Sequence, residues 1–338
     1  MSLWESRLPI VVLRLLHPKP YNHVPFSLLD VRCVYYLKFG AYLYEAEKAA
    51  GFDFHVLRVK LETGARIPPV QDMHSNIAVF ADNAATRSHP DWISQSPLGP
   101  ARMGNRNFNI YWDVVCATQP EHRAEQLDYI EDVDRHSLGV WLNSQYFADH
   151  GHCTCPRCKE LWKKSGLSWF EWRRKEVTDY IAQVRERVKK ELVMCIQPDP
   201  VTACERYGVD FDDLSKYADA FNVVMFSKSY ATPWYWEMLA RGFKKLLKKP
   251  VYISLYVYGP GDNAKDVPSA SELLTVSVRC ARTGIDGILY LANGASQIRD
   301  FQKATVDKVE HRKILEGYGG EPVQEVLDLV KSWEKIVE

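Results

Sequence analysis

Short hydrophobic runs alternate along this chain with longer segments in which apolar residues recur every three or four positions. Eight runs have the length and composition of buried strands. They fall at residues 9–15, 54–59, 77–80, 139–142, 192–196, 221–226, 251–257 and 287–291. Several are almost wholly apolar, as in a parallel sheet covered on both faces. The number and kind of runs predict an α/β fold, a (β/α)8 TIM barrel; an open doubly wound sheet is the alternative.

Helical periodicity fills most of the segments between these runs. It predicts helices over 31–50, 120–133, 168–190, 233–248 and 269–283, and an amphipathic helix over 322–338. The stretch from about 83 to 115 lacks periodicity and predicts a long functional loop at the barrel mouth. No linker-like composition divides the chain, so we expect residues 1–338 to form one domain.

Charge and composition limit the partners. The 43 basic and 43 acidic side chains balance, so the chain offers no basic field to nucleic acid or to an anionic membrane surface. It contains neither a membrane-spanning apolar run nor a signal peptide, and we expect a cytoplasmic protein. A neutral small molecule or an oligosaccharide suits this balance, and a homo-oligomer stays open.

Three of the eight cysteines crowd into one short segment, His152-Cys153-Thr154-Cys155-Pro156-Arg157-Cys158. A cytoplasmic chain seldom uses such a cluster for disulfides, whereas structural zinc favours four thiolates in a tetrahedron. Cys116, at the end of the long loop, is the leading fourth ligand, with His150 and His152 as local substitutes. The sequence therefore predicts a metal knuckle at 150–158; free thiols in a tight turn are the alternative.

Polar and aromatic residues follow the predicted strands, where a barrel carries its chemistry. Aromatic rings stack on the apolar faces of sugars, and amides or carboxylates bind the hydroxyls. The candidate sugar contacts are Trp92, Trp112, Gln145, Tyr146, Tyr230, Trp234, Tyr256, Tyr258 and Asn293. Packing between the barrel and its helices explains such aromatic residues in about half of such positions.

Part of the chain resembles two groups of barrel glycoside hydrolases. The segment with Cys116, Pro120, Arg123, Gly139-Val-Trp-Leu-Asn143 and the cysteine cluster is similar to the family 42 β-galactosidases. The sequence His89-Pro90-Asp91-Trp92 with the same cluster resembles glycosyl hydrolases related to α-L-fucosidases. The resemblance implies structural zinc at Cys116, Cys153, Cys155 and Cys158, and a retaining glycosidase acting on a β-galactoside or an α-L-fucoside.

The chain departs from both patterns where a catalytic carboxylate is expected. Asn143-Ser144 stands in place of the Asn-Glu pair of family 42, and Asn143 takes the place of the fucosidase-type nucleophilic Asp. The end of the seventh strand, residues 255–259, also lacks the expected Glu. Either the protein is an inactive relative, or other carboxylates act, or Asn143 is an engineered amide. Among Glu62, Asp82, Asp199 and Asp262, the favoured substitutes are Glu62 and Asp199, which closely follow strands.

Three functions therefore compete. The first is a glycosidase with catalytic positions at Asn143, Glu62 and Asp199. The second is a carbohydrate-binding pseudoenzyme of the same fold. The third is a zinc-dependent hydrolase, which requires an open coordination position that a four-thiolate site does not offer.

Overall fold

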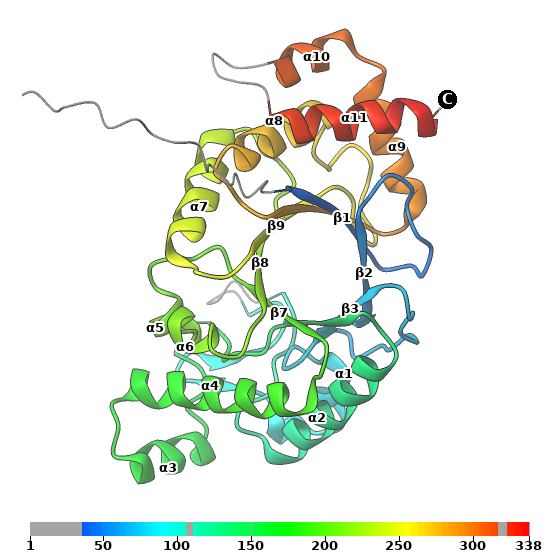
Figure 1. Cartoon of the computed structure of the whole chain (residues 1–338). Coiled ribbons are helices and arrows are strands. Elements are labelled where there is room, and N and C mark those ends of the chain that lie inside the picture. Colours follow the sequence, from blue (N-terminus) through cyan, green and yellow to red (C-terminus); the bar gives the residue numbers. More distant parts are fainter. Residues whose placement is uncertain (1–35, 106–110, 150, 317–322, 338) are drawn as a thin grey trace, which may run out of the picture. The chain divides into compact units, whose positions relative to one another are not determined.

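The computed structural model describes residues 36–105, 111–149, 151–316 and 323–337. Eight parallel strands close into a barrel in the order β1-β10-β9-β8-β7-β6-β3-β2 (Figure 1). Their bounds are β1 Lys38–Leu43, β2 Phe54–Lys60, β3 His74–Ala78, β6 Gly139–Asn143, β7 Glu191–Ile196, β8 Ala220–Met225, β9 Val251–Tyr256 and β10 Gly287–Ala292. The predicted (β/α)8 barrel is confirmed. The prediction of one domain over 1–338 stays a prediction, because residues 1–35 lie outside the described part.

The first barrel strand is not where the sequence pattern placed it. Strand β1 occupies Lys38–Leu43, inside the segment predicted as a helix over 31–50, and that helix prediction is wrong for these residues. Alanine and leucine favour a helix locally, but parallel pairing with β2 on one side and β10 on the other overrides this preference. The predicted strand at 9–15 lies outside the described residues.

Helices cover the outside of the barrel. The long ones are α2 Pro120–Arg135, α4 Trp169–Arg187, α7 Pro233–Leu246, α8 Ala270–Ala281, α9 Ala295–Val306 and α11 Gln324–Val337. Shorter helices are α1 Asn83–Ser88, α3 Pro156–Ser165, α5 Ala203–Tyr207, α6 Phe211–Leu214 and α10 Val309–Glu316. The predicted helices at 120–133, 168–190, 233–248 and 269–283 are thus present. Capping boxes at Ser168 and Ser269 fix the starts of α4 and α8, because each serine and a glutamate three residues later bond to each other's backbone.

The amphipathic pattern predicted near the C-terminus is also present, as α11. Val326, Val330 and Trp333 are buried, and Val323 and Leu327 are partly buried. The helix packs against α9 (Figure 1). Trp333 meets the rings of Tyr290 and Phe301, so α11 closes one side of the barrel.

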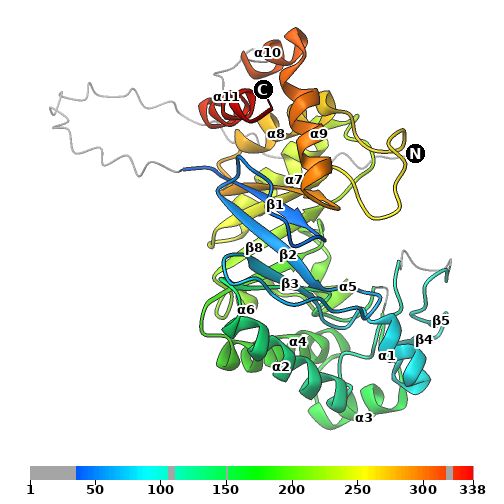
Figure 2. The ribbon, with the colours of Figure 1, turned by 90° about the vertical axis from the view of Figure 1, so that its right-hand side faces the viewer.

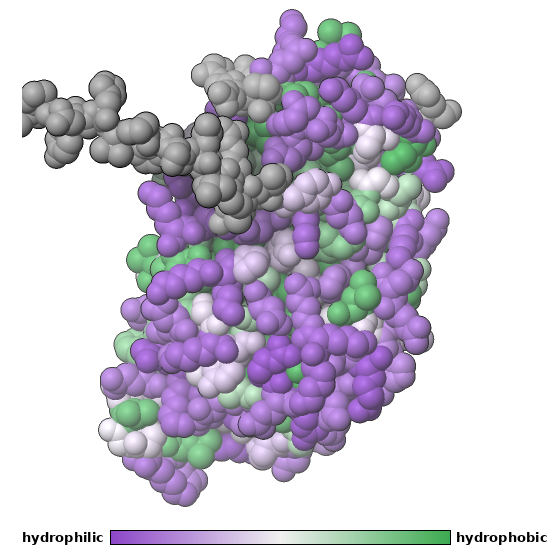
Figure 3. Space-filling view, in the orientation of Figure 1, coloured by the Kyte–Doolittle hydropathy of each residue, from purple (hydrophilic) through white to green (hydrophobic). Residues whose placement is uncertain are grey.

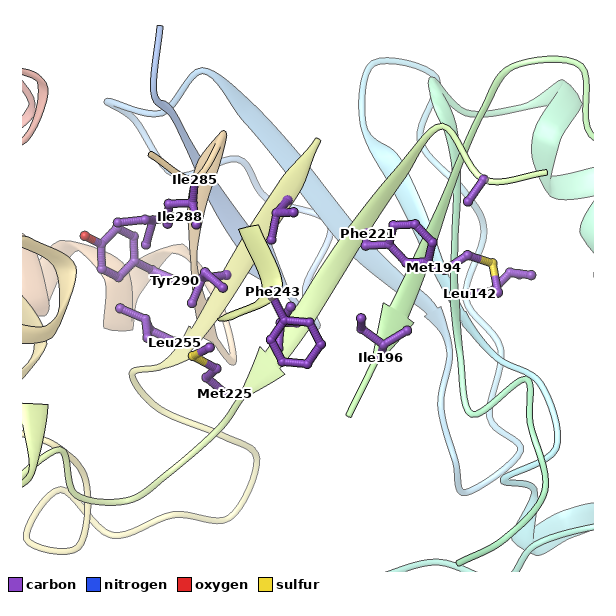
Figure 4. Close-up of a cluster of buried hydrophobic side chains, with 14 of the residues drawn as sticks. Leu142, Met194, Ile196, Phe221, Met225, Phe243, Leu255, Ile285, Ile288 and Tyr290 are labelled. Atoms are coloured by element: carbon purple, nitrogen blue, oxygen red, sulfur yellow. The ribbon is translucent and has the colours of Figure 1, made fainter. Parts of the chain in front are cut away.

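Hydrophobic side chains form two layers because neighbouring strand residues point to opposite faces. The outer layer, between strands and helices, includes Leu142, Met194, Phe221 and Leu255 (Figure 4). The inner layer fills the barrel with Tyr42, Val56, Trp141, Val193, Cys195, Ala220, Tyr252, Leu289 and Leu291. The barrel is therefore packed through its centre, and a ligand has to bind at one of its two ends.

A long excursion after β3 lies beside the C-terminal ends of the strands. It contains α1, the 3-10 turn η1 Pro90–Trp92 and a small hairpin of β4 Gln95–Ser96 and β5 Gly99–Pro100. Figure 2 shows these elements on the side to which the arrowheads of β1 to β3 point. The described part of the predicted loop at 83–115 thus carries short elements of its own. Its place beside the mouth agrees with the prediction.

The outer surface is mixed in character. On the face shown in Figure 3, hydrophilic residues predominate and hydrophobic ones are scattered among them. None of the helices in the described ranges is both long enough and apolar enough to span a bilayer.

Candidate functional site

Four cysteines meet at the rim of the mouth. The Sγ atoms of Cys116, Cys153, Cys155 and Cys158 all lie within 4.8 Å of one another. Cys116 Sγ is 3.4 Å from Cys158 Sγ and 3.8 Å from Cys155 Sγ. Four ligands about 2.3 Å from a tetrahedral zinc ion are separated from one another by similar distances. The donor set therefore fits a structural metal.

Local backbone structure holds the cysteines in place. Cys155 caps α3, and Pro156 follows at the first helical position, where its missing N–H costs nothing. Cys153 Sγ accepts a hydrogen bond from the Gln95 amide at 3.2 Å, and the Thr154 amide donates to Gln95 O at 2.7 Å. The cluster thus ties the excursion after β3 to the loop after β6.

The chemistry of the sulfurs agrees with metal binding. Hydrogen bonds among the four thiols lower the pKa of Cys155 and bring that of Cys153 to about 7, and they raise the pKa values of Cys116 and Cys158, so two of the four sulfurs are readily ionised without a metal. Thiolates are the form that binds zinc. His152, one proposed substitute ligand, instead directs Nδ1 to Asp149 O at 2.7 Å, and His150 lies outside the described residues. The metal group is the four cysteines.

The base of the mouth holds a buried carboxylate. Glu62, only 6% exposed, follows β2 and forms an ion pair with Arg58, which is 2% exposed. Asn143, the last residue of β6, donates from Nδ2 to the same oxygen, Glu62 Oε1, at 3.1 Å. The two strand ends thus bring together two of the three predicted catalytic residues. Among the described residues, Glu62 Oε2 has no hydrogen-bond partner. It is also not one of the fully buried polar atoms that lack a partner, so it keeps some access to solvent.

Arg58 is a site residue that sequence reasoning missed. It donates to the Tyr42 hydroxyl at 2.6 Å, and its Cζ lies 5.6 Å from the centre of the Tyr44 ring. A cation at an inward-facing position of a buried strand was the available signal. Burying it without an anion would be costly, so its presence implied a partner such as Glu62.

Aromatic rings surround this ion pair. Tyr42 lies parallel to Tyr44 with ring centres 6.5 Å apart, and Phe226 lies 6.5 Å from Tyr42 and 5.9 Å from Tyr256. These rings come from β1 and from the ends of β8 and β9. Of the four, only Tyr256 had been predicted as a sugar contact. Tyr42 and Tyr44 were missed because the first strand had been placed elsewhere.

The other candidate carboxylates have different partners. Asp82 is buried, pairs with Lys60 and caps α1. Asp199 accepts from the amides of Val201 and Thr202 and pairs with Arg206. Asp82 and Asp199 are thus held by a helix cap, a turn and ion pairs, whereas Glu62 is held by Arg58 of β2 and Asn143 of β6.

Asp262 supplies a carboxylate at the end of β9, where residues 255–259 themselves contain none. The turn after β9 folds back so that Asp262 accepts from the Tyr256 hydroxyl and from the Gly259 amide at 2.9 Å. Lys228 Nζ lies 2.5 Å from its other oxygen. Burial alone would raise the pKa of Asp262, but Lys228 and Tyr256 together hold it below the usual value. A carboxylate therefore stands at the end of the seventh barrel strand after all.

The remaining predicted sugar contacts divide by exposure. Gln145 is buried and donates to Cys195 O at 2.9 Å. Tyr230 is 1% exposed and bonds to Met225 O and to the Tyr256 amide, which is a packing role. Tyr146 accepts from Gln197 Nε2 at 2.9 Å.

The other five lie nearer the surface. Tyr258 donates to Asp262 O at 2.6 Å, and Asn293 donates to Glu45 Oε1 at 2.9 Å. Trp92 stacks on His89 with ring centres 3.9 Å apart. Trp112 and Trp234 are exposed, Trp234 at 56%.

The barrel is similar to that of glycoside hydrolases. α-L-Fucosidase isoenzyme 2 from Paenibacillus thiaminolyticus aligns with 89% of this chain and 49% of its own, at TM-score 0.56 and 11% identity. The chain thus spans about half the length of that enzyme. An α-galactosidase from Thermus thermophilus, solved with p-nitrophenyl α-D-galactopyranoside, aligns with 77% of this chain and 58% of its own, at TM-score 0.41 and 11% identity.

The identities limit what these likenesses show. At 11% identity the fucosidase establishes a shared fold, and the second likeness is too weak to support any inference. No family model matches the sequence, and neither does any curated protein. The chain therefore shares its barrel fold with the fucosidase, while the family 42 likeness stays a resemblance of motifs.

Proposed function

We propose that this protein is a glycoside hydrolase that acts on a β-galactoside or an α-L-fucoside, with Glu62 as its nucleophilic carboxylate. The observation that supports this most is the anchoring of Glu62. Arg58 and Asn143 both bind Oε1, which leaves Oε2 as the oxygen able to face a sugar. A neighbouring cation such as Arg58 favours the ionised form of a carboxylate, which is the form that a nucleophile needs.

Asn143 is then a positioning residue for Glu62. A retaining glycosidase places its two carboxyl groups about 5 to 5.5 Å apart, with the sugar between them. Asn143 Nδ2 touches Glu62 Oε1 at 3.1 Å, which is too close for positions 62 and 143 to flank a bond. The second carboxylate must come from another strand end. Asp262, at the end of β9, is the candidate by position, but Lys228 and Tyr256 lower its pKa, whereas a general acid needs a raised one.

The sugar-binding surface is supplied by an aromatic collar, which consists of the rings of Tyr42, Tyr44, Phe226 and Tyr256. Tyr44 lies beside Arg58, the partner of Glu62, and Phe226 contacts Tyr42 and Tyr256. Exposed Trp112 and Trp234 lie on loops and helices that follow strands. Sugars present apolar C–H faces that stack on such rings. A neutral saccharide also agrees with the balanced charge of the chain.

The four cysteines would hold zinc in a structural role. A site closed by four thiolates has no open position for water, so the metal stabilises the two loops that shape the mouth. This favours the glycosidase over a zinc-dependent hydrolase. A cytoplasmic location and a homo-oligomeric state remain predictions.

Azide rescue tests the nucleophile. The protein is assayed with aryl β-galactosides and aryl α-L-fucosides, and we expect hydrolysis of at least one. Glu62→Ala should lose activity by about 10³-fold, and azide should restore release of the phenol by attacking the sugar in place of the carboxylate. Glu125→Gln, which removes a carboxylate on the outer surface, is the matched control. Full activity in Glu62→Ala would refute the assignment.

A carbohydrate-binding pseudoenzyme is the second candidate. The observation that favours it is the amide of Asn143 at the position of the fucosidase-type nucleophile. Calorimetry with galactose, fucose and their oligosaccharides separates the two. Sugar binding without turnover in the present sequence would support the pseudoenzyme, and Asn143→Asp would then show whether one carboxylate restores hydrolysis.

A further inference from the structure

The opposite end of the barrel, where the strands begin, contains a cavity. Its volume is about 120 Å³, and it is lined by Lys38, Asp53, Phe54, His74, Trp141, Glu191 and Tyr252. Lys38, Phe54, His74 and Glu191 are the first residues of their strands. The cavity therefore lies away from Glu62 and Asn143, which stand at or just after strand ends.

Aromatic rings form the floor of this cavity. Trp141 and Tyr252 have ring centres 5.5 Å apart at an angle of 31°, and Phe54 lies 6.1 Å from Trp141 and 5.7 Å from Tyr252. His74 meets the edges of Phe54 and Trp141 at about 6 Å. These four rings pack together and all line the cavity.

Glycines make room for the rings. A Cβ atom on Gly40 would lie 2.7 Å from the Phe54 ring, and one on Gly287 would lie 2.6 Å from the Tyr252 ring. Both rings are thus pressed against bare backbone, and their positions are fixed by the barrel. A rigid aromatic wall loses little entropy when a ligand binds.

The charges around the cavity favour a cation. Asp53 and Glu191 face it with one opposing charge, Lys38. Burial lowers the pKa of His74 to about 4, so this ring is neutral near pH 7. Aromatic faces attract cations in addition.

We infer that this aromatic cavity, with Glu191 and Asp53 at its edge, binds a small organic ammonium ion. A cavity of about 150 Å³ accommodates benzene, so one of 120 Å³ suits a group of about five heavy atoms. The Glu191 side chain is 35% exposed and lies 3.4 Å from His74 Nδ1, which leaves it able to approach a ligand. The inference is independent of the proposed glycosidase activity.

Calorimetry of the full chain with tetramethylammonium chloride tests this inference. We expect saturable binding at millimolar concentrations. Potassium chloride at equal ionic strength and tert-butanol, a neutral molecule of similar shape, should not bind. In the ¹⁵N spectrum the indole signal of Trp141, assigned from Trp141→Phe, should shift with the ligand.

Variants locate the site. Glu191→Gln should weaken binding about tenfold, and Tyr252→Leu should weaken it by a similar factor. Glu186→Gln removes an exposed carboxylate near the end of α4 and should leave binding unchanged. Circular dichroism verifies that each variant is folded. If Tyr252→Leu does not fold, the affinity of Glu191→Gln for tetramethylammonium is the deciding measurement. No binding, equal binding of tert-butanol, or unchanged affinity in Glu191→Gln would each overturn the inference.

Discussion

Replacement of Lys60 by methionine should destabilise the protein strongly. Lys60 is fully buried, and its ammonium group lies 2.8 Å from Asp82 Oδ2 and 2.7 Å from Ala78 O. Methionine keeps the length of the side chain but removes the charge. Asp82 then remains as a buried carboxylate without its cation.

The structure sets the size of this effect. Removal of one partner from a buried ion pair costs about 3 to 5 kcal/mol, because the other charge stays buried. Asp82 keeps one hydrogen bond, from the Ala85 amide at 2.8 Å, as the cap of α1. We therefore expect a loss near the lower limit, about 3 kcal/mol of unfolding free energy. Adding Asp82→Asn, which removes the stranded charge, should recover more than half of this loss.

Urea denaturation followed by tryptophan fluorescence measures the four proteins of this double-mutant cycle. Lys60→Met within about 0.5 kcal/mol of the wild type, a typical surface effect, would refute the reasoning. So would additive effects of Lys60→Met and Asp82→Asn, since two residues in contact should show a coupling energy.

The same pair predicts how stability depends on acid. Burial alone would raise the pKa of Asp82, but the Lys60 ammonium and the Ala85 amide hold it below the usual value. The stabilisation is therefore complete above the unfolded pKa of about 3.9 and is lost as the pH falls through the lower folded pKa. Asp82→Asn should flatten this part of the curve. An equally steep acid limb in the variant would contradict the assignment.

Further predictions concern the metal centre, a backbone turn and the C-terminal helix. Elemental analysis should find one zinc per chain, and Cys158→Ser should lose it and lower the melting temperature, whereas Cys204→Ser, outside the cluster, should keep both. Gly208→Ala should cost about 1 to 3 kcal/mol in urea denaturation, because φ is +74° and the new Cβ would lie 2.9 Å from Arg173 O. Gly166→Ala has a positive φ but open space, and should cost less; equal losses would contradict the steric part. Trp333→Ala should cost about 3 to 5 kcal/mol, because this side chain is 1% exposed, and a loss under about 1 kcal/mol would show that α11 is not part of the core.

Much of the fold could be predicted because it depends on local patterns. Seven barrel strands and five long helices were visible as apolar runs and helical periodicity. The first strand was not, because the Lys38–Leu43 segment contains residues that suit a helix. Only its two parallel neighbours make it a strand, and they lie 11 or more residues away along the chain.

The candidate site could be predicted in part for a related reason. A strand end marks where a side chain stands, so Glu62 and Asn143 were found. Arg58, Tyr42 and Phe226 were missed because their roles depend on which strands face each other across the barrel. Asp262 was noticed but not given its place, because only the folded turn returns it to the end of β9.

The sequence by itself determined the (β/α)8 class, the cysteine cluster and the absence of a carboxylate at position 143, because periodicity and ligand spacing are local properties. The tertiary structure alone decided which groups meet. It paired Glu62 with Arg58 and Asn143, returned Asp262 to a strand end, and gathered Glu191 and three aromatic rings at the far end of the barrel. Closure of the barrel brings residues from distant parts of the chain within a few ångströms, and burial then requires each charge to find its partner.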